Sequence, residues 1–275
     1  MRLHSAANKF NDVIAVDAYG GTEFACQWAP HDLFKVEGTR VRVRSMTTAP
    51  DVVIPQRGVA IFDTEHYLIG VGTPDFWKGK VIRRNYVIQG ADGLAQLTSI
   101  AGALAGAAPV EAYAAAVFAK YIPETGDSSK YPPQYQIFLA GSEDAPADSL
   151  VTLNAVTYLI KESYLSSSGL RIALANVLSA PLFETVGFGA QTYDPVTDTY
   201  SGAASSVKIM RVKWTEHYSY LSIGSETYER GDQQVFMPKT VTPKASDTLT
   251  LSDGTWRILA VQDETDRWSC HVRRA

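Results

Sequence analysis

Cysteine is almost absent from this chain of 275 residues. The two cysteines, Cys26 and Cys270, stand near opposite ends, and no CxxC pair is present. This pattern excludes a zinc ribbon and does not indicate a disulfide framework. Histidine is also scarce, and no histidine stands at metal-ligand spacing from another histidine or a cysteine. The five histidines are His4, His31, His66, His217 and His271. We therefore predict no metal and no cofactor.

Catalytic motifs are missing as well. The chain has no GxGxxG, GxxxxGK[ST], HExxH or GxSxG sequence. Two Glu-His pairs, 65–66 and 216–217, stand beside aromatic β segments, where a turn or a rim position is the ordinary explanation. We predict no catalytic residue and no enzyme activity. A hydrolase that uses Asp/Glu chemistry stays open as an alternative that no constellation supports.

Charge of one sign is not in excess. The formal net charge is -4, and charged residues make up 20% of the chain. A dedicated nucleic-acid binder usually has a basic face, which this balance does not favour. The weakly acidic balance is compatible with a channel wall past which DNA merely slides.

Long strongly apolar runs are also lacking. Segment 100–119 is rich in Ala and Gly and is broken by Pro109 and Glu111. A membrane span needs about 20 strongly apolar residues, and segment 1–12 has no apolar signal core. We predict no membrane contact and expect helices near 92–121. Asp92 could cap the first of these helices, and Pro109 could begin the second.

Strand patterns dominate the rest of the chain. Segments 40–44 and 207–214 alternate polar and apolar residues, and segment 135–139 is rich in aromatic and β-branched residues. Gly, Pro, Asp and Ser clusters separate these runs. The sequence therefore predicts a mainly β protein.

An internal repeat is the most informative feature. Segments 148–160 and 247–259 share an acid, a hydroxyl residue, a leucine, a short strand, a turn and an aromatic strand. The likeness extends upstream, to 136–139 and 234–237, and downstream, to 170–174 and 270–274. A fainter third copy runs through 59–62, 67–71 and 81–88. Coincidence between aromatic hairpins is the alternative.

The repeat predicts two to three small β-barrel or β-sandwich modules, because a lone hairpin is marginal in water. We expect segments 131–178 and 231–275 to share one strand order. We also expect Tyr158 and Trp256 to be buried at equivalent positions, against Leu150 and Leu249. The expected organisation is a β module at 1–91, a helical or connecting segment at 92–125, a middle module at 126–180 and a C-terminal module at 181–275.

Interaction residues are predicted at two places. Segment 73–80 carries Phe76 and Trp77, which either form an interaction hot spot or fold back onto the core. Arg40, Arg42 and Arg44 would share one strand face, as phosphate or acidic-partner contacts or as a solvated face. The acidic cluster 263–266 is either a cation site or a solvated hairpin turn, and segment 193–200 is predicted to be a hairpin tip.

Segment 247–262 resembles the closing segment of the small head–tail connector proteins of tailed bacteriophages, and 268–274 resembles their basic final strand. The chain is longer than a single-module connector, and its expected helical segment departs from their pattern. The resemblance implies a virion protein, assembled in the host cytoplasm, that forms a homo-oligomeric ring between portal-side and tail-side phage proteins. DNA would pass through the channel without specific binding.

Two function classes follow. The first is a structural ring in the connector or the upper tail. The second is a tail-fibre or baseplate module that binds a receptor or a carbohydrate through its aromatic loops. The sequence leaves open the ring stoichiometry, the connector or tail layer, the lumen-facing residues and the host.

Overall fold

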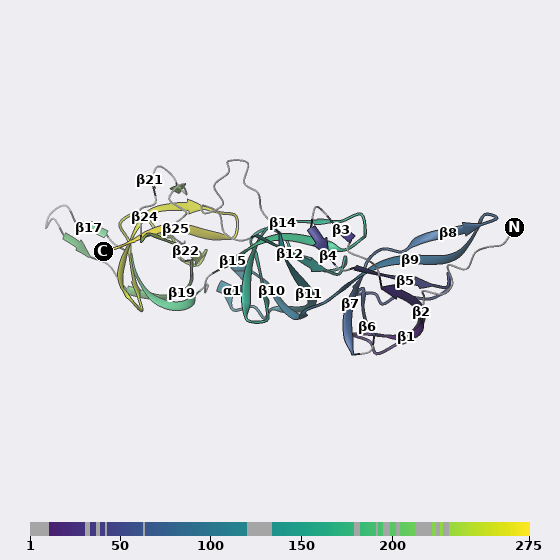
Figure 1. Cartoon of the computed structure of the whole chain (residues 1–275). Coiled ribbons are helices and arrows are strands. Elements are labelled where there is room, and N and C mark those ends of the chain that lie inside the picture. Colours follow the sequence, from purple (N-terminus) through teal and green to yellow (C-terminus); the bar gives the residue numbers. More distant parts are fainter. Residues whose placement is uncertain are drawn as a thin grey trace. The chain divides into compact units, whose positions relative to one another are not determined.

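The computed structural model describes residues 11–275, apart from 31–33, 37–38, 42, 63, 120–133, 179–181, 191, 195–198, 202–203, 213–221, 224–225 and 228–230. Within these bounds the chain is almost entirely β, with one short helix, α1 (Ile100–Ala105). The strands form three closed barrels of six strands each (Figure 1). The prediction of a mainly β fold with small repeated barrels is confirmed.

Barrel 1 is an antiparallel ring in the order β5-β2-β1-β6-β7-β9, closed by pairing of β9 with β5. An additional strand, β8, pairs with the first half of β9. A small separate hairpin, β3–β4, stands in the sequence between β2 and β5. The strands are β1 (Asn11–Asp17), β2 (Glu23–Pro30), β3 (Phe34–Val36), β4 (Thr39–Val41), β5 (Val43–Thr48), β6 (Val59–Phe62), β7 (Glu65–Ile69), β8 (Thr73–Trp77) and β9 (Lys80–Gly90).

Barrel 2 follows in the order β10-β11-β12-β15-β14-β13, and barrel 3 in the order β16-β19-β22-β25-β24-β23. Two hairpins, β17–β18 and β20–β21, are inserted in barrel 3. The strands of barrel 2 are β10 (Gly93–Ser99), β11 (Val110–Ala119), β12 (Gln134–Leu139), β13 (Ser149–Leu153), β14 (Val156–Leu165) and β15 (Arg171–Leu178). Those of barrel 3 and its insertions are β16 (Leu182–Gly189), β17 (Thr192–Asp194), β18 (Thr199–Ser201), β19 (Ala204–Val212), β20 (Ser222–Ile223), β21 (Glu226–Thr227), β22 (Gln233–Pro238), β23 (Thr248–Leu251), β24 (Gly254–Asp263) and β25 (Arg267–Arg274).

All three barrels share one topology. If the six barrel strands of each are numbered along the chain, the spatial order is 1-2-3-6-5-4 every time. The fourth strand returns by a crossover to lie beside the first, which is a Greek key. The shared order confirms the predicted repeat, including the fainter copy in barrel 1. Pairing of β17 with β18 also confirms the hairpin predicted for 193–200.

The fourth and fifth strands of each barrel carry the repeat signature. In barrel 3, Leu249 pairs with Trp256 across a two-residue turn, and Trp256 is buried. In barrel 2, Val151 pairs with Tyr158 in the same way. Ala60 and Tyr67 are the equivalent pair in barrel 1. Each aromatic side chain therefore enters the core of its barrel five residues after the apolar residue that precedes the turn, namely Phe62, Leu153 or Leu251.

One detail of the predicted repeat is wrong. Tyr158 and Trp256 are equivalent, and Trp256 faces Leu249 as expected, but Tyr158 faces Val151 rather than Leu150. When the two segments are aligned on their shared Asp-hydroxyl-Leu motif, Tyr158 and Trp256 are one residue out of register. Side chains alternate across a strand, so a shift of one residue moves a side chain to the opposite face of the sheet. The structure therefore aligns Val151, and not Leu150, with Leu249.

The predicted helical segment is mostly strand. β10 covers the expected first helix and β11 the expected second helix, so both belong to barrel 2, which begins at Gly93. In β10, Ala95 and Leu97 are buried while Leu94 and Gln96 are exposed, which is the alternation of a strand. Of the described residues in this segment, only those of α1, capped by Ser99 and ended by Gly106, are helical. Among the described residues, no helix has the length and apolarity to cross a membrane.

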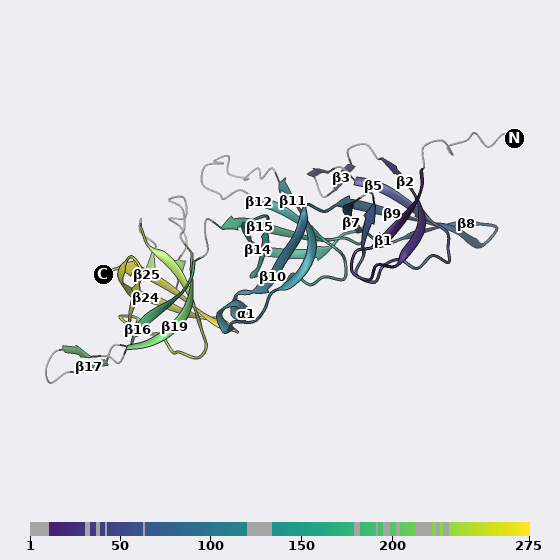
Figure 2. The ribbon, with the colours of Figure 1, turned by 90° about the horizontal axis from the view of Figure 1, so that it is seen from below.

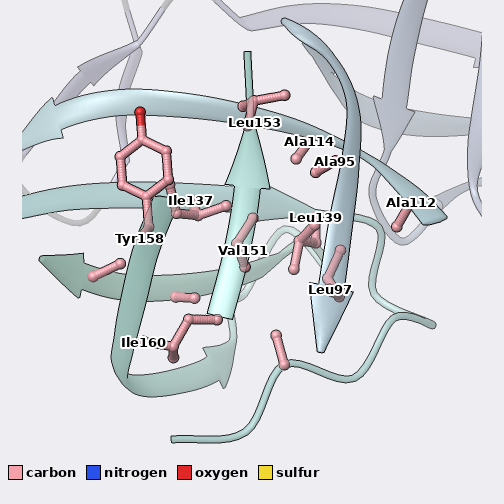
Figure 3. Packing of buried hydrophobic residues seen from close by; sticks show 13 residues of the cluster. Ala95, Leu97, Ala112, Ala114, Ile137, Leu139, Val151, Leu153, Tyr158 and Ile160 are labelled. Atoms are coloured by element: carbon pink, nitrogen blue, oxygen red, sulfur yellow. The ribbon is translucent and has the colours of Figure 1, made fainter. Parts of the chain in front are cut away.

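Barrel 2 shows why this segment is rich in alanine. Figure 3 shows Ala95, Ala112 and Ala114 pointing into the same interior as Leu139, Tyr158 and other large side chains. A six-stranded barrel has a narrow interior that alternating small and large side chains fill. The alanines therefore leave room for the large residues of the facing strands.

The barrels fall into two compact units. One unit holds barrels 1 and 2, and the other holds barrel 3 together with segment 98–109, which includes α1. In the second unit, the Lys208 ammonium donates to the carbonyl of Ala103 at 2.7 Å.

Barrels 1 and 2 meet through the outer faces of their sheets. Val59 and Leu68 of barrel 1 pack against an apolar surface of barrel 2. That surface comprises Ala115, Phe138, Ala140, Leu170 and Ile172. At the edge of this joint, Arg57 of barrel 1 forms a salt bridge with Glu143 of barrel 2 at 2.7 Å.

The backbones also approach closely at this joint. The amide of Val71 donates to the carbonyl of Ser168 at 2.7 Å. Gly169 has φ +78, and a Cβ there would lie 2.5 Å from the amide nitrogen of Val71. Both the positive φ and the lack of room for a Cβ therefore require glycine at this position.

We expect Gly169→Ala to loosen the joint between barrels 1 and 2. The matched control is Gly79→Ala, because Gly79 has φ +77 with nothing within 4 Å of an added Cβ. Both variants take on backbone strain, but only Gly169→Ala adds a clash, which should destabilise by a further 1–3 kcal/mol or so. Hydrogen exchange of peptides from β6, β7 and β15 measures the difference. Equal effects of the two variants would contradict the close-approach argument.

We expect Trp256→Ala to cost barrel 3 about 3–5 kcal/mol, because the indole is buried in its core. Arg257→Ala, at the next and exposed position, is the control. Hydrogen exchange of barrel 3 peptides is the measurement, because the two units need not unfold together. A cost no larger than that of the control would show that the indole is not a core residue.

Candidate interaction surface

The hairpin of β8 and β9 extends beyond the body of barrel 1. Figures 1 and 2 show from two directions that this hairpin projects past the other strands of its barrel. The strands are paired from Thr73 with Asn85 to Trp77 with Lys80. Lys78 and Gly79 make the turn with positive φ values of 48° and 77°. Segment 73–80 thus forms one strand and the turn of a two-stranded arm, Thr73–Asn85, rather than an open loop.

The two aromatic residues predicted as interaction residues lie at the tip of this arm. Phe76 is 64% exposed and Trp77 is 63% exposed. The alternative that they fold back onto the core is therefore wrong. Large apolar side chains held together in solvent are typical of binding surfaces. Contact with a partner remains a prediction.

An ion pair connects the two strands of the arm near its tip. The Arg83 guanidinium donates to the Asp75 carboxylate at 2.5 Å, next to a β-bulge between Asp75 and Phe76. Hydrogen bonds from Arg83 and Asn85 lower the pKa of Asp75. The pair is exposed to solvent, so its contribution to stability is small. It links the two strands of the arm across the bulge.

The predicted arginine stripe does not form as one strand face. Arg40 lies in β4, which pairs with β3, whereas Arg44 lies in β5 of barrel 1. Arg42 lies outside the described residues. The Arg44 guanidinium lies 4.3 Å from the ring centre of Trp28 and 5.2 Å from that of Tyr67. Cation–π contacts within barrel 1 therefore engage Arg44.

A hollow of about 600 Å³ lies beside the arm, and Ile82 and Arg83 of the arm are part of its lining. It is lined by residues of β1, β2, β5, β9 and the crossover between β5 and β6, among them Ile14, Ala25, Gln27, Thr47, Val52 and Ile82. Ile14 is 59% exposed and Ile82 is 50% exposed. Sequence reasoning missed this hollow because the lining comes from distant segments. The one available signal was the run Val13-Ile14-Ala15-Val16, which breaks the polar–apolar alternation.

Cys26 also lines the hollow but is buried, and burial raises the pKa of its thiol to about 11. Burial likewise raises the pKa of Cys270 to about 12. The thiolate is the nucleophilic form. Neither cysteine is therefore a reactive nucleophile near neutral pH.

The histidines within the described residues have structural surroundings. The ring of His66 stacks on Tyr113 with centroids 4.2 Å apart. His271 is completely buried in barrel 3, and its Nε2 lies 2.6 Å from the Asp232 carboxylate, which Arg273 also contacts. A ring with no exposed surface does not reach an external substrate. His4, His31 and His217 lie outside the described residues.

The acidic cluster 263–266 is a hairpin turn between β24 and β25. Asp263 pairs with Lys239, while Glu264 and Asp266 both pair with Arg267. Two cationic side chains of barrel 3, Lys239 and Arg267, therefore offset part of the charge of the three carboxylates. Across the described part of the chain, no group of three or more His, Cys, Asp or Glu residues is arranged to hold a metal ion.

Comparison with known proteins adds no relative: no family model, curated protein or solved structure matches this chain.

We expect the double variant Phe76→Ala, Trp77→Ala to leave the stability of barrel 1 unchanged within about 0.5 kcal/mol, as exposed substitutions usually do. Phe62→Ala is the contrasting variant, because Phe62 is buried in the same barrel and its truncation should cost about 3–5 kcal/mol. Thermal unfolding and hydrogen exchange of barrel 1 peptides compare the variants. A double variant as unstable as Phe62→Ala would mean that the arm is part of the folding core.

Proposed function

We propose that the chain is a structural subunit of a ring in the head–tail connector or upper tail of a tailed bacteriophage. The observation that carries the proposal is the combination, in one chain, of three barrels of the same topology with an arm that presents Phe76 and Trp77 to solvent. An arm of this kind is suited to bind a neighbouring protein. The resemblance of the last strands to connector proteins supports the same conclusion.

The barrel interiors support a scaffold role. Among the described residues, apolar side chains from all six strands pack the interior of each barrel, as in small barrels whose interior is filled by side chains. Closure of each ring pairs both edges of its six barrel strands, which limits random pairing with other chains, and leaves β8 as the edge strand of the arm. Specific contacts then fall to the arm and to the inserted hairpins.

The charge distribution fits a wall that DNA passes. Several arginines are engaged by partners within their own unit: Arg44 by Trp28, Arg57 by Glu143, Arg83 by Asp75, Arg211 by Asp253, Arg267 by Glu264 and Arg273 by Asp232. Lysines and arginines that bound phosphates would slow the passage of DNA. Internal pairing instead leaves these guanidinium groups less available to phosphates.

A particle that lacks this protein tests the proposal. We expect such particles to fill with DNA and then leak it, or to fail to gain a tail. Electron microscopy and DNA retention after nuclease treatment are the measurements. Complete, tailed particles that cannot attach to cells would overturn the connector function and support the receptor- or carbohydrate-binding alternative. Native mass spectrometry of the purified protein gives a second test, since rings support the connector and trimers support a fibre.

A further inference from the structure

We infer that the free edge of β8 pairs with an extended, acidic segment of another protein. The inference rests on the proposed function, in which the arm binds a neighbouring protein, and it names the chemistry of that partner. It depends on three observations: a free strand edge on the arm, exposed aromatic side chains beside that edge, and an arm whose charge is opposite in sign to that of the whole chain.

β8 is the edge strand of the arm. Each of the six strands that close barrel 1 has a neighbour on both sides, whereas β8 pairs with β9 alone among the described strands. Figure 2 shows the arm extending past the other strands of its barrel, which leaves room for a partner beside it. An edge strand offers N–H and C=O groups to which a further strand can be added.

The turn of the arm determines which backbone groups this edge offers. Lys78 and Gly79 form a two-residue turn with positive φ values. Trp77 and Lys80 are opposite each other beside this turn. In an antiparallel hairpin with such a turn, the flanking pair exchanges both hydrogen bonds, and the next residue directs its backbone groups away from the partner strand. The N–H and C=O of Phe76 therefore face the free edge.

Pro74 agrees with this assignment. The β-bulge places its extra residue, Ile82, in β9, so the alternation along β8 is regular. The backbone groups of Pro74 are therefore directed to the same edge as those of Phe76, two residues further on. Proline has no N–H and is tolerated in an edge strand where that position faces solvent. The edge thus offers the C=O of Pro74 and both groups of Phe76, which suits one short added strand.

The charge of the arm favours an acidic partner. The arm holds one carboxylate, Asp75, and four cationic side chains, whereas the formal net charge of the whole chain is -4. The cationic residues are Lys78, Lys80, Arg83 and Arg84. Arg83 forms an ion pair with Asp75, so the excess of positive charge falls to the other three. Lys78 and Lys80 are exposed at the tip. Complementary charges increase the rate of association and suppress wrong partners.

Phe76 and Trp77 add apolar area to the contact. Their side chains are 64% and 63% exposed, and successive residues of a strand point to opposite faces. An added strand alternates its side chains in the same way, so residues on each of its faces can pack against one aromatic ring. The partner segment should therefore combine apolar residues with carboxylates.

A nucleic acid also carries negative charge but does not use the strand edge. Its phosphates would contact the lysines, and its bases would stack on the aromatic rings. Neither group reproduces the alternating N–H and C=O groups of a peptide strand. The free edge of β8 therefore favours a protein segment.

Peptide titration of the full chain tests the inference. The probe is a short peptide of alternating Glu and Val. One control is its counterpart of alternating Lys and Val, and the other is the acidic peptide with N-methylated backbone amides, which cannot donate to a strand edge. We expect the acidic peptide to bind about tenfold or more tightly than either control. Amide hydrogen exchange at Phe76, followed by NMR, should slow with the acidic peptide alone.

Charge reversal on the arm gives a second readout. Lys78→Glu with Lys80→Glu should raise the Kd of the acidic peptide about tenfold or more and allow the basic peptide to bind instead. The matched control is Lys244→Glu with Arg257→Glu, which makes the same change of net charge at exposed positions of barrel 3. This control should leave the Kd of each peptide unchanged.

Four results would overturn the inference. The acidic peptide does not bind, or its N-methylated form binds equally well. A single-stranded oligonucleotide that binds the arm more tightly than the acidic peptide would assign the arm to a nucleic acid. Dimers of the natural chain in sedimentation velocity that Phe76→Ala, Trp77→Ala abolishes would assign the edge to a second copy. Each result leaves the connector function intact, because that function depends on the phenotype of particles that lack the protein.

Discussion

The turn between the fourth and fifth strands fixes the register of each barrel. In all three barrels two residues separate those strands, so the aromatic residue enters the core opposite a smaller apolar one: Tyr67 opposite Ala60, Tyr158 opposite Val151 and Trp256 opposite Leu249. A shift by one residue would turn the aromatic side chain outward. The shared strand order follows because the fourth strand, once placed beside the first, leaves the sixth to close against the third.

The outward faces of the same strands build the joint between barrels 1 and 2. Val59 and Leu68 occupy positions of β6 and β7 that alternate with the core residues of barrel 1, and they are buried only because barrel 2 covers them. Strands that are apolar on both faces therefore mark a barrel that has a neighbour. The close contact of Val71 with Ser168 and Gly169 then sets the spacing between the two barrels.

The sequence was sufficient to predict the strands and the repeat, because aromatic hairpins with short turns are local signals. It was not sufficient for segment 92–119, where alanine favours a helix in isolation but the narrow interior of barrel 2 needs small side chains on β10 and β11. The exposure of Phe76 and Trp77 was one of two readings of the sequence, and the pairing of β8 with β9 decided it. The hollow could not be predicted from the sequence, since its lining comes from segments far apart in the chain, as with Ile14 and Arg83, whose numbers differ by 69.

Tandem barrels of one topology carry a hazard during synthesis, because equivalent strands of adjacent barrels can exchange before each barrel closes. The cores of barrels 2 and 3 have diverged in a way that opposes this exchange. Ala112 and Ala114 of β11 take the places that Val207 and Ile209 of β19 take in barrel 3. Putting β11 into barrel 3 would leave voids, at a cost of about 2–5 kcal/mol for an Ile-to-Ala change alone. The reverse swap would overpack barrel 2. The small core residues of β11 and the large core residues of β19 thus favour the packing of each strand in its own barrel.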